Sequence, residues 1–142
     1  ETELEALGVL EAEIAELEAL RDKVPARKLA KLEEQIRLGK FIACHAATAA
    51  CVKEWYMLNI KLLGASGAEE ANELLDKLEA LANAEIANAE SAIPLVQADS
   101  RLGWEPSMEY VTDAWHINWK IRQVKYMLGE LQEFRELVNM PL

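Results

Sequence analysis

Hydrophobic side chains recur every three or four positions along most of the chain, which is the spacing of amphipathic α-helices. This pattern predicts helices over residues 2–23 and 25–63, then from 66 or 67 to 98, and from 112 or 113 to 138. Pro25 suits a first helical turn, and Gly64 suits the end of a helix. We therefore expect an all-α protein, an antiparallel bundle of four main helices.

The third predicted helix contains Pro94. Proline lacks the N–H of a helical hydrogen bond and its ring clashes with the preceding turn, so we expect a kink or a break there. An irregular connection should follow over residues 99–111, because the stretch DSRLGWEPSMEY, Asp99 to Tyr110, interrupts the helical pattern with charges, a glycine and a proline.

The second predicted helix changes character along its length. Its first part is basic, and a helical hairpin about Pro25 would place Lys31 near Glu16 or Glu18. From Leu38 onward apolar and small side chains occupy nearly all of its circumference. Such a helix is typical of a central, buried position, so we expect this part to lie in the middle of the bundle.

The last predicted helix carries two stripes. One stripe is aliphatic and consists of Ile117, Ile121, Val124, Leu128 and Leu131. The other consists of Trp115, Trp119, Arg122 and Tyr126, and lies about 200° around the axis at ~3.6 residues per turn. One side of a bundle cannot bury both stripes. Either this helix is enclosed on two sides within the chain, or its aromatic side meets another molecule.

Length and charge limit the function classes. The chain has 142 residues, which suits a single helical domain spanning residues 1–142. A net charge of −10 argues against a nucleic-acid partner, since such binders present clustered basic surfaces. No apolar run reaches the roughly 18 residues that a membrane span needs. The chain starts at Glu1 within a helical pattern, so we expect a fragment of a larger protein.

Metal and nucleophile chemistry finds little support. Cys44 and Cys51 are seven positions apart, about 10 Å along one helix, which is too far for a disulfide. A di-iron bundle needs two Glu-x-x-His units. Neither His45 nor His116 has glutamate three positions earlier, so we expect no metal and no cofactor, and we interpret His45 as a buried, hydrogen-bonded side chain.

The connection offers acidic groups for general acid–base chemistry, and a structural reading of the same residues competes with it. Asp99 can close the third helix, Arg101 can pair with Asp99 or Glu105, and Gly103 can supply a turn with positive φ. No Gly-x-Ser-x-Gly nucleophile motif is present. We therefore assign no catalytic residue.

Aromatic residues cluster near the connection, with Trp104, Tyr110, Trp115 and Trp119 inside sixteen positions. Flat amphipathic rings suit sugar faces and protein interfaces, and packing in the core is the alternative. The candidate binding residues are Asp99, Arg101, Trp104, Glu105, Tyr110, Trp115 and Trp119.

Two segments carry a resemblance to a known group of proteins. Residues 83–110 (NAEIANAESAIPLVQADSRLGWEPSMEY) with 116–128 (HINWKIRQVKYML) resemble the C-terminal helical region of large bacterial proteins, common among gut Firmicutes, that look like glycoside hydrolases and carry a domain of unknown function. Residues 38–63 are similar to the long helix that precedes this region. The Asp-Ser-Arg-Leu-Gly core at 99–103 is its most distinctive part.

The resemblance implies a non-catalytic accessory domain that packs on a catalytic domain or contributes to the rim of a sugar site. Its compartment would be the bacterial cytoplasm or the exterior. The alternative hypothesis is a self-contained bundle that binds a protein or forms a homodimer through Trp115, Trp119 and Tyr126. A bundle enzyme in its own right is a third hypothesis, based only on the acidic residues near the connection.

Overall fold

The computed structural model describes residues 3–105 and 110–141, and side chains over 5–104 and 111–141. The helices are α1 (Glu3–Glu18), α2 (Ala26–Leu63), α3 (Ala68–Ala98) and α4 (Ala114–Val138). Two short strands, β1 (Trp104–Glu105) and β2 (Tyr110–Val111), pair antiparallel within the connection that we expected to be irregular. The prediction of an all-α bundle with four main antiparallel helices is confirmed.

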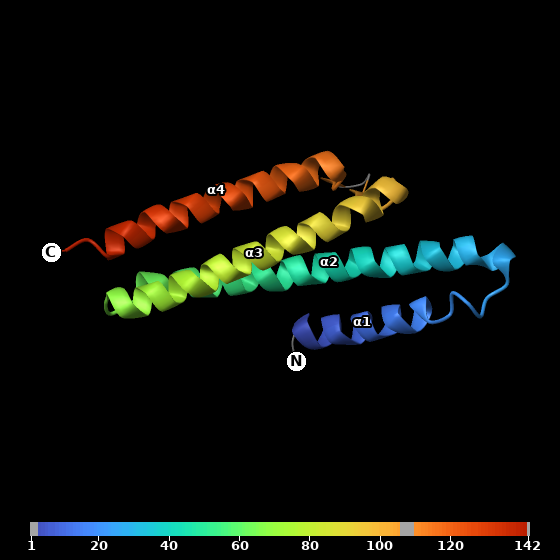
Figure 1. Cartoon of the computed structure of the whole chain (residues 1–142), viewed down its shortest axis with the longest axis horizontal. Coiled ribbons are helices and arrows are strands. Elements are labelled where there is room, and N and C mark those ends of the chain that lie inside the picture. Colours follow the sequence, from blue (N-terminus) through green and yellow to red (C-terminus); the bar gives the residue numbers. More distant parts are fainter. Residues whose placement is uncertain (1–2, 106–109, 142) are drawn as a thin grey trace.

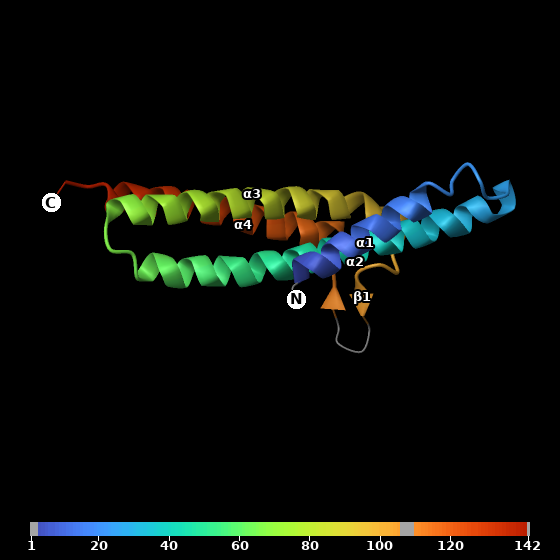
Figure 2. The same ribbon diagram turned by 90° about the horizontal axis from the view of Figure 1, so that it is seen from below.

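Helices that follow one another in the chain are neighbours in space. α1 packs on α2, α2 on α3, and α3 on α4. Figure 1 shows α4 along one edge of this array and α1 along the other. Figure 2 shows α3 and α4 in one layer, with β1 and β2 projecting from it towards the side of α2. The side of α4 that faces away from α3 is therefore the outer edge of the described chain.

α3 occupies the central position that we expected of α2. Leu75 and Leu78 are fully buried, with 0% of their surface exposed, and a second cluster of buried residues surrounds Ala89 and Ala92. α2 instead exposes large apolar side chains, namely Ile42, Val52, Tyr56, Ile60 and Leu63. The prediction of an all-round buried α2 is wrong, because α1 covers only part of its length and α4 packs on α3.

The hairpin of α1 and α2 has a different register from the predicted one. α1 ends at Glu18, and turns continue to residue 24. Glu18 pairs with Lys40 at 2.7 Å, whereas Lys31 pairs with Glu34 on its own helix at 2.7 Å. The helices approach closely here, since a Cβ on Gly39 would lie 3.0 Å from Ile14 Cγ1.

α3 continues through Pro94, so of the expected kink or break the break is absent. Proline removes one hydrogen bond, to the carbonyl of Glu90, but the turn beyond it closes normally. The amide of Asp99 donates to the carbonyl of Leu95 at 3.1 Å. Val96 is buried in the core cluster that also contains Phe41 and Ile117, and this packing holds the last turn of α3 in place.

Candidate functional site

The two stripes of α4 have opposite environments. Ile117, Ile121 and Leu131 of the aliphatic stripe are buried against the rest of the bundle. Trp115 and Tyr126 of the aromatic stripe are 62% and 71% exposed, and Trp119 is 47% exposed. The described chain therefore encloses one side of α4 only, and the aromatic side faces outward.

The exposed stripe is longer than the sequence analysis predicted. Leu137 is also exposed and continues the same spacing of three or four residues near the end of α4, and the exposed Met140 follows two residues beyond the helix. We call this set the outer stripe. It consists of Trp115, Trp119, Arg122, Tyr126, Gly129, Glu133, Leu137 and Met140. The spacing could have identified its second half, but Gly129 and Glu133 interrupt the apolar pattern.

Charge is divided along α4. Lys120, Arg122 and Lys125 lie in its first half, and Glu130, Glu133 and Glu136 lie in its second half. Arg135 is the basic exception, and it is engaged internally, at 2.8 Å from Asp76 and 3.3 Å from Glu79. A helix macrodipole favours acidic groups near the N-terminus and basic groups near the C-terminus. The order in α4 is the reverse, so it does not serve the stability of the isolated helix.

Arg122 and Glu133 are the two charged members of the outer stripe. Both side chains are exposed, and within the described part of the chain neither forms an ion pair or a side-chain hydrogen bond. Trp119, Arg122 and Tyr126 together line a shallow depression on the surface of α4. This arrangement places an unpaired guanidinium between two exposed aromatic rings.

Gly129 lies in the interior of α4 and on its outer side. A Cβ built on it would meet nothing within 4 Å, so no contact inside the described chain requires glycine at this position. Glycine in a helix interior costs roughly 0.5–1 kcal/mol relative to alanine. Gly129 thus lowers the stability of α4 and leaves the backbone uncovered by a side chain at the centre of the outer stripe.

A groove of about 300 Å³ lies beside the outer stripe, between α2 and α4. Lys120, which lines this groove, forms an ion pair with Glu85, which is buried behind it on α3. The hydroxyl of Thr48 donates to Glu85 at 2.7 Å and accepts hydrogen bonds from Lys120 at 3.2 Å and Asn88 at 3.1 Å. These polar groups satisfy one another, which indicates a structural role in joining three helices.

The two histidines line this groove without forming a ligand set. His45 Nδ1 lies 3.0 Å from the carbonyl oxygen of Phe41, so it is hydrogen-bonded as predicted, but the side chain is exposed and not buried. His116 belongs to the start of α4, where Asp113 accepts a hydrogen bond from its backbone amide at 2.9 Å. Asp113 is thus the N-cap of α4, and it is one of the two start positions, 112 or 113, that the sequence predicted.

Asp99 and Arg101 tie the end of α3 to α2. The guanidinium of Arg101 donates to both carboxylate oxygens of Asp99, at 2.9 and 2.6 Å, and also pairs with Glu34. The hydrogen bonds from Arg101 lower the pKa of Asp99 to about 2 and raise that of Arg101. Gly103, with φ of 75°, makes the predicted turn. Both charged side chains are thus engaged in holding the connection.

The remaining candidate residues separate into three groups. Trp104 is 60% exposed on β1, next to the segment that Arg101 anchors. The structure does not describe the side chains of Glu105 and Tyr110, which we also predicted as binding residues. Trp115 and Trp119 belong to the outer stripe. The candidates whose side chains the structure describes are therefore not gathered into one pocket.

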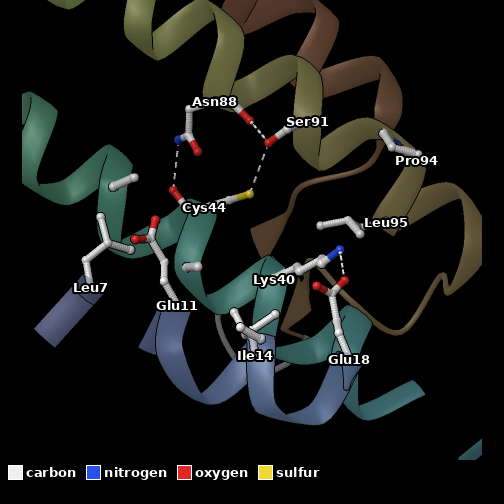
Figure 3. A pocket seen from close by; sticks show the side chains of 13 residues that line it. Leu7, Glu11, Ile14, Glu18, Lys40, Cys44, Asn88, Ser91, Pro94 and Leu95 are labelled. Carbon is white, nitrogen blue, oxygen red and sulfur yellow. Dashed lines mark hydrogen bonds and ion pairs between the residues drawn. The ribbon is translucent and has the colours of Figure 1, made fainter. Parts of the chain in front are cut away.

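A second groove, of about 510 Å³, lies where α1 crosses α2 and α3 (Figure 3). The Lys40 and Glu18 pair is at one end of it. Further along, Cys44 Sγ lies 3.4 Å from the hydroxyl of Ser91, and Asn88 donates to the carbonyl of Cys44 at 2.9 Å. The ion pair and these hydrogen bonds join α1, α2 and α3 along the groove.

Both cysteines are free thiols, as their spacing predicted. Burial and the nearby carboxylate of Glu85 raise the pKa of Cys51 to about 11, which makes it a poor nucleophile at neutral pH. Among the residues that the structure describes, no three His, Cys, Asp or Glu side chains are grouped closely enough to hold a metal ion.

No helix in the described part of the chain combines the length and the apolar character that crossing a membrane requires. Comparison with protein families, with characterised proteins and with solved structures gives no match. The outer stripe of α4, with its exposed aromatic rings, is the candidate functional site.

Proposed function

We propose that this chain is a non-catalytic helical docking module, and that the outer stripe of α4 is the surface by which it binds another protein. The observation that supports this most is the exposure of Trp115, Trp119 and Tyr126 on one side of a helix whose other side is already buried in the core. Contiguous exposed apolar surface of this kind usually marks an interaction site.

The composition of the stripe supports a protein partner. Tryptophan, tyrosine and arginine are the residues that most often dominate the binding energy of protein interfaces. Arg122 lies between Trp119 and Tyr126 and has no ion pair within the described chain. The matching partner surface would supply apolar side chains to the rings and a carboxylate to the guanidinium.

Site-specific photo-crosslinking in the cells that produce the protein tests this proposal. A benzophenone amino acid replaces Trp119 in one variant and Ala87, an exposed position on α3, in the control. The proposal predicts a defined cross-linked product, identified by mass spectrometry, from position 119 and little or none from position 87. Equal yields from the two positions would contradict it.

A second candidate role follows from the resemblance to glycoside-hydrolase-like proteins. In this role the chain is an accessory domain that packs on a catalytic domain of the same protein, or contributes to the rim of a sugar site. The observation that favours it is the position of Trp104, which is exposed and held beside the segment that Arg101 and Asp99 anchor. Its ring could stack on a sugar or on a neighbouring domain.

Tryptophan fluorescence tests the sugar-binding form of this role. Titration with a panel of soluble oligosaccharides should change the emission of the unmodified chain, and Trp104→Ala should abolish that change. Tyr56→Ala, which removes an exposed aromatic ring from α2, is the matched control and should bind normally. The absence of any response, in a chain that is folded by circular dichroism, would exclude binding of the tested sugars.

A further inference from the structure

We infer that the partner of the outer stripe is a second copy of this chain, with the two α4 helices packed antiparallel about a two-fold axis between Met127 and Leu128. This inference rests on the proposed docking function and names its partner. It follows from the order of side chains along the stripe. When a second stripe runs in the opposite direction, its side chains match those of the first in charge and size.

The pairing can be read from positions equidistant from the axis. In a symmetric dimer each contact occurs twice, because the same surface is used by both copies. Arg122 then faces Glu133 of the second copy, and Tyr126 faces its Gly129. Towards the ends of the interface, Trp115 and Met140 of the second copy are equidistant from the axis, and Trp119 lies beside the exposed Leu137, one position from its equidistant partner Glu136.

Charge complementarity supports the antiparallel direction. The exposed basic residues Arg122 and Lys125 lie in the first half of α4, and the exposed acidic residues Glu130, Glu133 and Glu136 lie in the second. Lys120 is not counted here, because it pairs with Glu85 inside the chain. An antiparallel pair places each basic half beside an acidic half, whereas a parallel pair would place like charges together. The antiparallel arrangement also explains why basic residues come first along α4 and acidic residues second, a distribution that the macrodipole of the single helix disfavours.

Shape complementarity supports the position of the axis. Gly129 leaves a bare stretch of backbone where an added Cβ would meet nothing in its own chain. Tyr126, which is 71% exposed, is the large side chain placed opposite it in the dimer. A ring packed on a glycine lets two helices approach closely, so the dimer gives a reason for a residue that weakens α4 on its own.

Sedimentation velocity over a range of protein concentrations, at physiological salt, tests the inference. The unmodified chain should form a dimer. Gly129→Leu should weaken it by about tenfold to a hundredfold, because the new side chain meets the tyrosine ring at two symmetric places. Leucine favours helix more than glycine, so this variant should remain folded, as circular dichroism and its melting temperature will show.

A charge-swap series tests the register. Arg122→Glu should weaken the dimer by at least about tenfold, because two carboxylates then face one another. The double variant Arg122→Glu/Glu133→Arg restores the pair in reversed order and should return the dissociation constant to within about threefold of the original. Lys77→Glu, at an exposed position on α3, makes the same change in net charge and should have little effect.

The results separate this inference from the docking function. A chain that stays monomeric at every concentration, or a double variant that is no better than Arg122→Glu alone, would overturn the antiparallel dimer. In that case a photo-crosslink from position 119 to a different protein would leave the docking function intact. A monomer that also gives no crosslink would contradict both.

Discussion

Glu85 on α3 and Lys120 on α4 form an ion pair beside the groove between α2 and α4, and the hydroxyl of Thr48 donates to the same carboxylate oxygen at 2.7 Å. Glu85 is 6% exposed and is the one charged side chain among those described that is buried. The contact thus joins α2, α3 and α4 next to the outer stripe, through polar groups that satisfy one another.

Breaking this pair from one side should destabilise the fold. Lys120→Met leaves a buried carboxylate without its cation, and should lower the free energy of unfolding by about 1–3 kcal/mol, less than a fully buried pair because Lys120 is partly exposed. Glu85→Leu/Lys120→Met removes both charges and should recover most of the loss. Urea denaturation measures both variants. A double variant as unstable as the single one would show that the pair is not the cause.

Residues of the core and of the outer stripe should respond differently to truncation. Leu75→Ala removes a fully buried side chain and should cost about 2–5 kcal/mol of stability. Trp119→Ala removes a larger but half-exposed side chain and should cost less than about 1 kcal/mol in dilute, monomeric protein, if the stripe serves binding and not folding. Equal losses in chemical denaturation would assign the stripe to the core.

Gly129→Ala should stabilise the monomer, by roughly 0.5–1 kcal/mol, because alanine is the better helix former and its Cβ meets no atom of the chain. Thermal unfolding of dilute protein measures this directly. Gly67→Ala, just before α3 in equally open space but outside a helix interior, is the control and should not give the same gain. A destabilised Gly129→Ala would mean that α4 needs glycine for an internal reason.

The carboxyl of Asp99 should titrate with a pKa of about 2 in the folded chain, because Arg101 donates hydrogen bonds to its ionised form. A depressed native pKa means that the contribution to stability is present above the ordinary value of 3.8 and is lost as the pH falls through about 2. Carbon-detected NMR can follow this carboxyl, and Arg101→Gln should move its midpoint towards 3.8. An unchanged midpoint in that variant would exclude Arg101 as the cause.

Cys51 should react slowly with iodoacetamide at pH 8. Burial raises its pKa to about 11, so the thiolate that attacks the reagent is scarce in the folded chain. Alkylation of a Cys44→Ser variant, followed by mass spectrometry, isolates the rate at Cys51. Unfolding in urea should accelerate that rate by roughly a hundredfold, and a rate that is equally fast in both states would contradict the burial of this thiol.

Local features of the fold could be read from the sequence because each depends on a few neighbouring residues. The helix starts after Pro25 and at Asp113, and the turn at Gly103, follow from proline, capping and glycine chemistry. The two-sided character of α4 follows from the spacing of Trp115 and Trp119 against Ile117 and Ile121.

Features that depend on how helices pack could not be read in the same way. An apolar circumference predicted a buried α2, but burial also needs enough partner helices, and α1 covers only part of it. The pairing of Glu18 with Lys40 instead of Lys31 depends on where α1 ends. The second half of the outer stripe was missed because Gly129 and Glu133 do not continue an apolar pattern. They can be assigned to the stripe only once that side of α4 is known to be exposed.

The exposure of Trp119 in the monomeric chain is the most direct test of the docking surface. We would measure iodide quenching of its fluorescence in dilute protein, with Trp55, Trp104 and Trp115 replaced by phenylalanine and the monomeric mass confirmed by sedimentation. The account predicts clear quenching, intermediate between that of a buried tryptophan and that of the unfolded chain because Trp119 is 47% exposed, and this quenching should fall when a partner covers the stripe. A Trp119 that is protected from iodide in the monomer would contradict it, because the aromatic side of α4 would then be part of the core.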